Sequence, residues 1–376
     1  MQENDDITLL VDGREAFPEI LRCIDAAERS IVINMFIWRA DEIGKRMAEA
    51  VLRAADRGVK VEISVDRYAI VLERSEECTH SFFHERPSLV EWWKIGGIKL
   101  SYPDLYMKHP PRATHRGLQE RLLAHPNVTV ERDRFKADHS KFYIIDEKIL
   151  ILGGINIEDK ENDADVSGRI YRDYMVKLVG EAYVRAFRAE LWEGKTIPSG
   201  VRFVVNTKPP LPRRFMMMEH YLSLIREAKR ELQITMPYFS PLRPFLSEIL
   251  AAYRRGVKVS ILVPERANFE NDSNRKTVRY LLDKSNGGIA VYLSPRMVHA
   301  KMMYNEKEIS LGSSNITKKA FRQLSELNLA LPRDGSSAAQ RLLESDEENR
   351  RISRRVHDPR EIRYRRFAAW LESLVV

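Results

Sequence analysis

One polar motif occurs twice in this sequence and decides its fold. The first copy reads His139-Ser-Lys141-Phe-Tyr-Ile-Ile-Asp146 and continues to Leu152-Gly-Gly-Ile-Asn156; the second reads His299-Ala-Lys301-Met-Met-Tyr-Asn-Glu306 and continues to Leu311-Gly-Ser-Ser-Asn315. In each copy His and Lys are two residues apart, so on a strand both side chains point to one face. A lone His-x-Lys carries little information, but the same set at matched spacing indicates one functional unit built from two halves.

A wider repeat surrounds the motif. Residues 24–38 match residues 225–239, and residues 57–63 match residues 255–261. Each copy reads as helix, buried strand, helix, Gly and strand, and Arg57-Gly58 and Arg255-Gly256 suit the left-handed residue that ends a helix. Strands that alternate with helices predict an α/β sheet in each half. We therefore expect two similar α/β/α sandwich lobes related by a pseudo-twofold axis, with the active site at their interface.

The expected boundaries follow from the repeat. The first lobe spans residues 1–206, a Pro-rich linker spans 207–213, and the second lobe spans 214–376. The stretch from Gly58 to His139 is 38 residues longer than that from Gly256 to His299, which indicates an insert at about residues 68–112. This aromatic insert has three interpretations: a cover over the cleft, an apolar surface for acyl chains, or local packing.

Composition places the chain among folded proteins of two or three domains, because it has 376 residues, 44% of them hydrophobic and 31% charged. Its two cysteines, Cys23 and Cys78, exclude a disulfide framework. The acidic amino terminus shows no apolar segment of a signal peptide, and no apolar run approaches the ~20 residues that span a bilayer. The sequence therefore predicts a cytoplasmic protein.

The net charge of +8 favours anionic partners, and much of it lies near the carboxyl terminus. Residues 350–366 hold eight arginines against Asp358 and Glu361, and an apolar tail with Trp370 follows. A basic segment beside such a tail is typical of a helix on an anionic membrane. We therefore expect peripheral attachment to the cytoplasmic membrane, with a solvated helix face and core packing of the tail as the alternatives.

Together the two motifs predict a site for a phosphate diester. Lys141, Lys301, Asn156 and Asn315 would hold the non-bridging oxygens, where negative charge grows in the transition state. One neutral imidazole can attack phosphorus while the other, protonated, gives its proton to the leaving alkoxide. The turn residues expected to support the phosphate are Gly153, Gly154, Gly312, Ser313 and Ser314. Because the lysines supply positive charge, we expect neither a metal nor another cofactor.

Acidic residues follow each motif. Asp173 lies 34 residues after His139, and Glu326 lies 27 residues after His299, so each is available to orient a histidine. The alternative interpretation is that Asp173 and Glu326 are ordinary exposed acids.

These motifs resemble those of the phospholipase D superfamily over essentially the full chain, and 36–38, 41–44, 57–61, 237–239 and 312–315 resemble bacterial cardiolipin synthases. The resemblance implies two-step phosphatidyl transfer without metal through a phosphohistidine. It also implies His139 as the nucleophile, His299 as the acid, and Asp173 and Glu326 as their supporting carboxylates.

The chain departs from the superfamily pattern at two motif positions. Glu306 stands where the motif has the Asp that Asp146 supplies in the first copy, an acid whose role in the family is mainly structural. Gly154 stands where Ser is common, so one hydroxyl is missing on that side.

The leading interpretation is a cardiolipin synthase-like enzyme that converts two phosphatidylglycerols to cardiolipin and glycerol. A phospholipase D that transfers the phosphatidyl group to water is the nearest alternative. A nuclease is an alternative of another class, because the same residues cleave nucleic-acid diesters and the chain is basic. Against it, the basic cluster adjoins an apolar tail rather than aromatic stacking surfaces. A non-catalytic lipid-binding relative is disfavoured by the presence of both histidines, both lysines and both asparagines. The sequence leaves the acceptor and the oligomeric state open.

Overall fold

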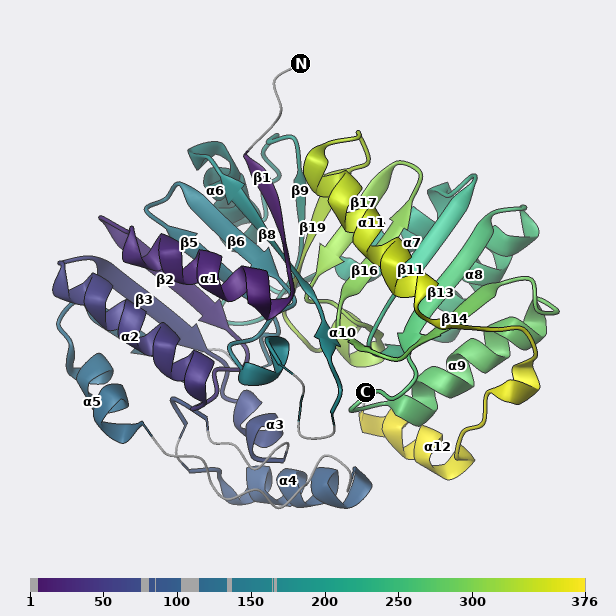
Figure 1. Cartoon of the computed structure of the whole chain (residues 1–376), viewed down its shortest axis with the longest axis horizontal. Coiled ribbons are helices and arrows are strands. Elements are labelled where there is room, and N and C mark those ends of the chain that lie inside the picture. The colour runs from purple at the N-terminus through teal and green to yellow at the C-terminus, as the bar shows by residue number, and fades with distance from the viewer. Residues whose placement is uncertain are drawn as a thin grey trace.

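The computed structural model describes residues 6–75, 81–84, 86–102, 115–133, 137–163, 165 and 168–375. Two mixed sheets stand side by side and each carries helices, so the predicted α/β fold of two lobes is confirmed (Figure 1). The elements before residue 194 are strands β1 (Ile7–Val11), β2 (Ser30–Met35), β3 (Lys60–Val65), β4 (Val128–Glu131), β5 (Phe142–Ile145), β6 (Ile149–Gly153), β7 (Tyr171–Arg172) and β8 (Tyr174–Val179), with helices α1 (Asp12–Asp25), α2 (Glu42–Asp56), α3 (Ala69–Ser75), α4 (Leu89–Ser101), α5 (Arg116–Ala124), α6 (Glu181–Arg188), η1 (Asp159–Glu161) and η2 (Ala189–Glu193).

The remaining elements are strands β9 (Arg202–Thr207), β10 (Arg214–Phe215), β11 (Glu231–Thr235), β12 (Phe239–Ser240), β13 (Lys258–Pro264), β14 (Ala290–Ser294), β15 (Met297–Val298), β16 (Lys301–Asn305), β17 (Glu308–Gly312), β18 (Ile316–Thr317), β19 (Glu326–Pro332) and β20 (Arg354–Val356), with helices α7 (Met217–Glu227), α8 (Arg243–Arg254), α9 (Asn271–Lys284), α10 (Lys318–Arg322), α11 (Ser337–Arg351), α12 (Arg366–Val375) and η3 (Pro359–Glu361).

The internal repeat is visible in the strand order. The first sheet runs β1-β8-β6-β5-β2-β3-β4, and the second runs β10-β9-β19-β17-β16-β11-β13-β14-β20. In both sheets the first two strands of the repeat pair in parallel, β2 with β3 and β11 with β13, and the motif strands β5 and β16 pair antiparallel with β2 and β11. Gly58 and Gly256, with φ of 97° and 89°, follow α2 and α8 in the predicted left-handed conformation.

The lobe boundary differs from the sequence expectation. Strand β9 pairs with β19 in the second sheet, as β1 pairs with β8 in the first, and the two-residue strand β10 lies outside β9 at the edge. The second copy of the fold therefore begins at Arg202, and the change of lobe precedes it. The Pro-rich stretch 207–213, expected to be a linker after a first lobe ending at 206, is a loop between β9 and β10 within the second lobe.

Three large apolar cores hold the molecule together. One lies between the first sheet and helices α1 and α2, and another lies between the second sheet and helices α7, α8 and α9. The third joins the two sheets, with Ile144 and Leu152 from the first, Met302 and Leu329 from the second, and side chains of α6 and α11. The inner face of each sheet is therefore buried largely by the other lobe, which fixes the two copies of the motif relative to each other.

The described residues of the insert pack in two places. Phe82 and Phe83 pack on Trp38 in the first core, with ring centroids 5.9 and 5.1 Å from the indole. Helices α3 and α4 pack together through Ile70, Val71 and Ile95. Local packing thus accounts for part of the insert.

Candidate active site

Both histidines lie in loops that lead into equivalent strands. His139 and Lys141 precede β5, and His299 precedes Lys301 at the start of β16. All four side chains are buried, the imidazoles at 9% and 6% exposure and the lysines at 0% and 1%. Lys141 Nζ donates to the carbonyl of His139 at 2.5 Å, and Lys301 Nζ donates to the carbonyl of His299. The two His-Lys pairs therefore make the same local contact, as the repeat predicts.

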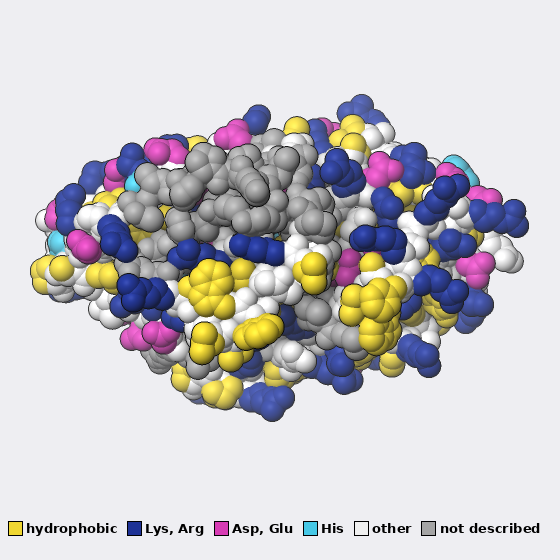
Figure 2. All heavy atoms as spheres, turned by 90° about the horizontal axis from the view of Figure 1, so that it is seen from below, with side chains coloured by type: hydrophobic (Ala, Val, Ile, Leu, Met, Phe, Trp, Pro, Cys, Tyr) yellow, Lys and Arg dark blue, Asp and Glu magenta, His cyan; other side chains and the backbone are white. Residues whose placement is uncertain are grey.

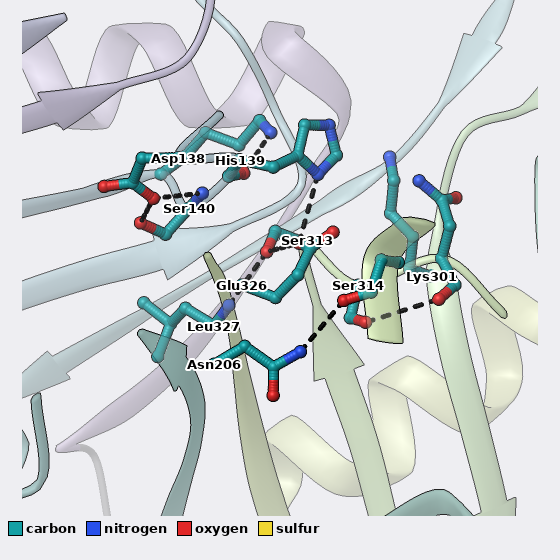
Figure 3. A network of polar contacts seen from close by, with 12 residues as sticks. Asp138, His139, Ser140, Asn206, Lys301, Ser313, Ser314, Glu326 and Leu327 are labelled. Atoms are coloured by element: carbon teal, nitrogen blue, oxygen red, sulfur yellow. Dashed lines mark hydrogen bonds and ion pairs between the residues drawn. The ribbon is translucent and has the colours of Figure 1, made fainter. Parts of the chain in front are cut away.

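Each histidine is hydrogen-bonded to a carboxylate of the opposite lobe. His139 Nδ1 lies 3.1 Å from Glu326 Oε2, and His299 Nδ1 lies 2.9 Å from Asp173 Oδ2. In the sequence each acid follows the histidine of its own motif, Asp173 after His139 and Glu326 after His299, whereas in the structure each contacts the histidine of the other motif. Figure 3 shows His139 pointing at Glu326, with Ser313 beside the same carboxylate.

Backbone contacts between the lobes cause this exchange. The amide of His139 donates to the carbonyl of Ser325 at 2.8 Å, which brings the next residue, Glu326, to the imidazole. The amide of His299 donates to the carbonyl of Arg172 at 2.8 Å, and β15 pairs in parallel with β7. Asp173, the residue after Arg172, is thereby held against His299. In both halves the histidine amide bonds the carbonyl just before the carboxylate of the other lobe. The result is two crossed pairs, His139 with Glu326 and His299 with Asp173.

The two halves differ electrostatically. Burial, and then the charges of Lys141 and Lys301, hold the pKa of His139 well below its ordinary value, so this ring is neutral near pH 7. Burial also raises the pKa of Glu326 to about 8. Although burial opposes it, the charge of Lys301 and the hydrogen bond to His299 lower the pKa of Asp173, which is therefore ionised.

His299 has a second carboxylate nearby. Glu161 Oε1 lies 3.5 Å from His299 Nδ1, and Lys301 Nζ lies 3.3 Å from Asp173 Oδ2. Glu161 follows Asn156 by five residues, and the residue at the same distance from Asn315 is Ala320. His299 Nδ1 thus faces two buried carboxylates, whereas His139 Nδ1 contacts Glu326.

The lysines complete the positive part of the site. Burial, and then the charge of Lys301, lower the pKa of Lys141 to about 7, and its Nζ lies 5.1 Å from the centre of the Phe36 ring. An anion between the two lysines would relieve their repulsion. The geometry is therefore that of a site prepared for a negatively charged group.

Asn156 and Asn315 each carry a buried amide oxygen that lacks a hydrogen-bond partner among the described residues. Asn156 Nδ2 donates to Glu158 Oε1 at 3.2 Å, and the buried Arg39 donates to Glu158 Oε2 at 2.5 Å. Sequence reasoning missed Arg39, Glu158 and Glu161. The position of Glu158 two residues after Asn156, on the same side of an extended chain, was the available clue.

The turn residues predicted to bind phosphate have other partners. The amides of Gly153, Gly154, Ser313 and Ser314 donate to Lys141 O, Tyr174 O, Leu327 O and Asn328 Oδ1. The Ser313 hydroxyl donates to Glu326 Oε2 at 2.5 Å, and the Ser314 hydroxyl donates to the carbonyl of Asn315 at 3.3 Å. These contacts join neighbouring strands and orient Glu326, so they do not favour the role expected from sequence.

Close packing explains the glycines of these turns. A Cβ at Gly154 would lie 2.4 Å from both oxygens of Asp173, and one at Gly312 would lie 2.2 Å from the carbonyl of Leu327. Gly154, where the superfamily often has Ser, thus leaves the room that the Asp173 carboxylate occupies.

Asp146 and Glu306 lie at the far ends of the motif strands and anchor the backbone. Asp146 accepts hydrogen bonds from the amides of Glu28, Arg29 and Ser30 at 2.7 to 2.9 Å. Glu306 accepts from the amides of Lys229 and Arg230 at 2.9 and 3.3 Å. Both acids hold the loop before the neighbouring strand, β2 or β11, rather than contacting a histidine, which agrees with a structural role.

Three atoms of metal-binding type lie together here. Oxygens of Glu161 and Asp173 and a nitrogen of His299 are buried within 4.8 Å of one another. The ammonium group of Lys301 lies at the same Asp173 oxygen and balances its charge. The expectation of a site without metal stays a prediction, tested by chelation below.

The fold and the paired His-Lys-Asn sets define an enzyme of the phospholipase D superfamily. Within it, the chain belongs to the family described as cardiolipin synthase, PLD-like domain, whose model matches residues 20–191 and 221–345. The chain is 27% identical to cardiolipin synthase B of Salmonella typhi over 352 residues, covering 88% of this chain and 77% of the relative. It is 24% identical to the major cardiolipin synthase ClsA of Bacillus subtilis over 348 residues, covering 87% and 65%.

Solved structures share the whole fold. The phosphatidylserine synthase of Haemophilus influenzae superposes with a TM-score of 0.72 at 13% identity, covering 99% of this chain and 95% of that one. The polyphosphate kinase of Porphyromonas gingivalis superposes with a TM-score of 0.55 at 14% identity, covering 98% of this chain and 52% of that one. The described part of the chain contains no helix with the length and apolar character needed to span a membrane.

Proposed function

We propose that this protein transfers a phosphatidyl group from one phospholipid to an alcohol, as a cardiolipin synthase does, with two phosphatidylglycerols giving cardiolipin and glycerol. The observation that carries the choice of a lipid is a cavity of about 140 Å³ that reaches His139. Phe36, Leu72, Ile98 and Phe269 contribute apolar side chains to its wall. In this wall the acid Glu270 accompanies the cation Lys319, so the wall suits a lipid better than a nucleic acid, whose backbone needs a basic groove.

In the first step, His139 Nε2 attacks phosphorus of the donor, and the bond from phosphorus to the oxygen of the headgroup glycerol breaks, while the diacylglycerol oxygen stays on phosphorus. Nδ1–H of His139 donates to Glu326 Oε2, which leaves the lone pair of Nε2 for attack. His299, as imidazolium beside Asp173 and Glu161, gives its Nε2 proton to the leaving glycerol oxygen. Lys141 and Lys301 stabilise the charge that grows on the non-bridging oxygens.

In the second step, the hydroxyl of a second phosphatidylglycerol gives its proton to the now neutral His299 and attacks phosphorus. The bond from phosphorus to His139 breaks, the ring becomes neutral again, and His299 is again an imidazolium. Water in place of the lipid alcohol would give phosphatidic acid, the product of the hydrolytic alternative. The apolar cavity supports the lipid alcohol, and we place the reaction at the surface of an anionic membrane.

The test is product analysis with purified protein. Labelled phosphatidylglycerol in detergent micelles should give cardiolipin and glycerol, and acid quench should recover a phosphoenzyme labelled at His139. His139→Ala and His299→Ala should each abolish turnover. Phosphatidic acid as the sole product would identify a hydrolase, and cleavage of single-stranded DNA without lipid turnover would identify a nuclease. Label on His299 would reverse the two histidine roles.

A further inference from the structure

Helices α4 and α12 expose large apolar side chains at one end of the molecule. Leu89, Trp93 and Leu100 of α4 are 81%, 84% and 86% exposed, and Phe367 and Trp370 of α12 are 70% and 52% exposed. Figure 2 shows two apolar clusters among Lys and Arg side chains on the face that carries these helices in Figure 1. Groups of exposed large apolar residues on one face mark interaction surfaces.

Both helices are held with these faces outward. Ile95 of α4 is buried against Ile70 and Val71 of α3. Ala369 of α12 is buried, its carbonyl accepts from the Ser273 hydroxyl at 3.3 Å, and Glu372 Oε2 accepts from the Ser273 amide at 2.6 Å. Each helix therefore has an inner side packed on its own lobe, and its exposed apolar residues lie on the outer side.

The carboxyl end of α4 lies at the cavity that reaches His139. Ile98 and Tyr102, at the carboxyl end of α4, line this cavity. The Tyr102 ring packs edge-on against Phe269 of the second lobe with centroids 5.2 Å apart. Burial, and then the nearby charge of Glu372 in α12, raise the pKa of Tyr102. The carboxyl end of α4 therefore forms part of the cavity wall, and Glu372 of α12 lies near the same end of α4.

The charges around these faces are mostly positive. Helix α4 carries Lys94 and Lys99, and Arg363 and Arg366 lie at the start of α12, where Arg365 pairs with the buried Asp272 at 2.9 Å. The acids of both segments are occupied internally: Glu91 pairs with Arg67 at 3.0 Å, and Glu372 bonds to Ser273. A basic rim around apolar side chains matches the headgroups and acyl chains of an anionic bilayer.

We propose that α4 and α12 form one docking surface for an anionic phospholipid bilayer and turn the cavity entrance toward it. The proposal rests on the proposed function in one respect, since a lipid substrate is what would use an entrance facing the membrane. A second copy of the chain on this surface would instead cover the entrance.

This docking surface differs from the one expected from sequence. The arginines at 350–355 were expected to contribute, but Arg350 donates to Ser260 Oγ at 2.7 Å and pairs with Asp346 at 3.1 Å. Arg354 pairs with Glu265 and Glu361 at 3.0 and 3.2 Å. The docking surface thus includes the carboxyl-terminal tail, as expected, and also α4, whereas Arg350 and Arg354 stabilise the fold.

The test is sedimentation with vesicles of equal parts phosphatidylglycerol and phosphatidylcholine, compared with pure phosphatidylcholine. Wild type should pellet with the anionic vesicles at low salt and detach at 1 M salt, where the Debye length falls to ~3 Å. Trp93→Ser with Leu100→Ser, and Phe367→Ser with Trp370→Ser, should each weaken binding at least tenfold. Met216→Ser with Ile352→Ser, exposed apolar residues outside both helices, is the matched control and should bind like wild type.

Equal pelleting of all variants would overturn the docking surface. So would a wild-type dimer in light scattering that the α4 or α12 variant converts to a monomer, because the face would then be an interface between copies. Circular dichroism and thermal unfolding confirm that each variant is folded. Wild-type activity in detergent micelles is measured separately: its absence would reject the proposed function, whereas the sedimentation result alone decides the docking surface.

Discussion

His139 of the first lobe and Glu326 of the second are 187 residues apart in sequence, and their side chains are joined by a 3.1 Å contact between Nδ1 and Oε2. The reciprocal contact joins His299 to Asp173 at 2.9 Å. Neither lobe therefore contains a complete histidine–carboxylate pair. Separating the lobes would remove the carboxylate from both imidazoles at once, so the apolar core shared by the two sheets is a requirement for the site.

The crossed pairing predicts which step each acid supports. Glu326→Gln replaces an acceptor at Nδ1 with an amide that can donate to it, which places the ring hydrogen on Nε2, the attacking atom. We expect phosphoenzyme formation to fall by about 10²–10⁴-fold, as when a triad carboxylate is replaced by an amide. Rapid acid quench with labelled phosphatidylglycerol measures this rate.

A donor with a p-nitrophenol leaving group separates the two pairs, because that group departs without a proton from an acid. Asp173→Asn and His299→Ala should form phosphoenzyme from it at near wild-type rates, whereas Glu326→Gln should remain slow. The opposite result, rescue of Glu326→Gln alone, would mean that the functional pairs do not follow the observed contacts.

The internal repeat predicted the two-lobed fold because its two copies have similar residues at matching positions in their strands and motifs. The crossed pairs were not predictable in the same way. They depend on the backbone contacts of Ser325 with His139 and of Arg172 with His299, which lie between lobes and leave no spacing pattern in the chain. The boundary was misplaced for a related reason: β9 has no matching motif, and its membership of the second sheet depends only on its pairing with β19.

Glu306 should tolerate replacement by the acid of the first motif. Its carboxylate accepts two backbone hydrogen bonds ahead of β11, as Asp146 does ahead of β2. Glu306→Asp should leave kcat within a few-fold, whereas Lys301→Ala should lower it by about 10²–10³-fold, the typical cost of losing one transition-state partner. Steady-state kinetics in micelles compares the two variants, and equal losses would assign Glu306 a direct role.

Arg350 should matter for stability. It donates to Ser260, Thr235 and Asp346, and Asp346 is fully buried. Removing one partner of a buried ion pair leaves an uncompensated charge, so Arg350→Gln should lower the free energy of unfolding by about 3 kcal/mol. Denaturant unfolding measures this, with exposed Arg351→Gln as the control expected to stay within about 0.5 kcal/mol. Equal stabilities of the two variants would mean that Arg350 behaves as an ordinary surface cation.

Chelation should not affect the reaction. Lys301 Nζ lies 3.3 Å from the Asp173 oxygen that a cation would use, and Lys141 supplies the second positive charge. Activity in detergent micelles should survive exhaustive EDTA treatment, and micelles keep chelation from altering the charge of a membrane. Loss of activity that one particular cation restores would place a metal at Glu161, Asp173 and His299 and contradict the lysine-based mechanism.

Anion binding should weaken as the pH rises above neutrality. The pKa of Lys141 is about 7 in the protein without ligand, because of burial and then the charge of Lys301, and the pKa of Glu326 is about 8, because of burial. A bound anion stabilises the protonated form of both groups, so binding above pH 7 must be accompanied by proton uptake. Sulfate is a suitable probe since its charge is constant over this range. Its affinity should fall as the pH rises from 7 to 9, and more steeply toward pH 9, where both Lys141 and Glu326 have lost their protons in the free protein. Titration calorimetry in buffers of different ionisation heat should show uptake of more than one proton at pH 8, and an affinity independent of pH with no proton uptake would contradict the lowered pKa of Lys141.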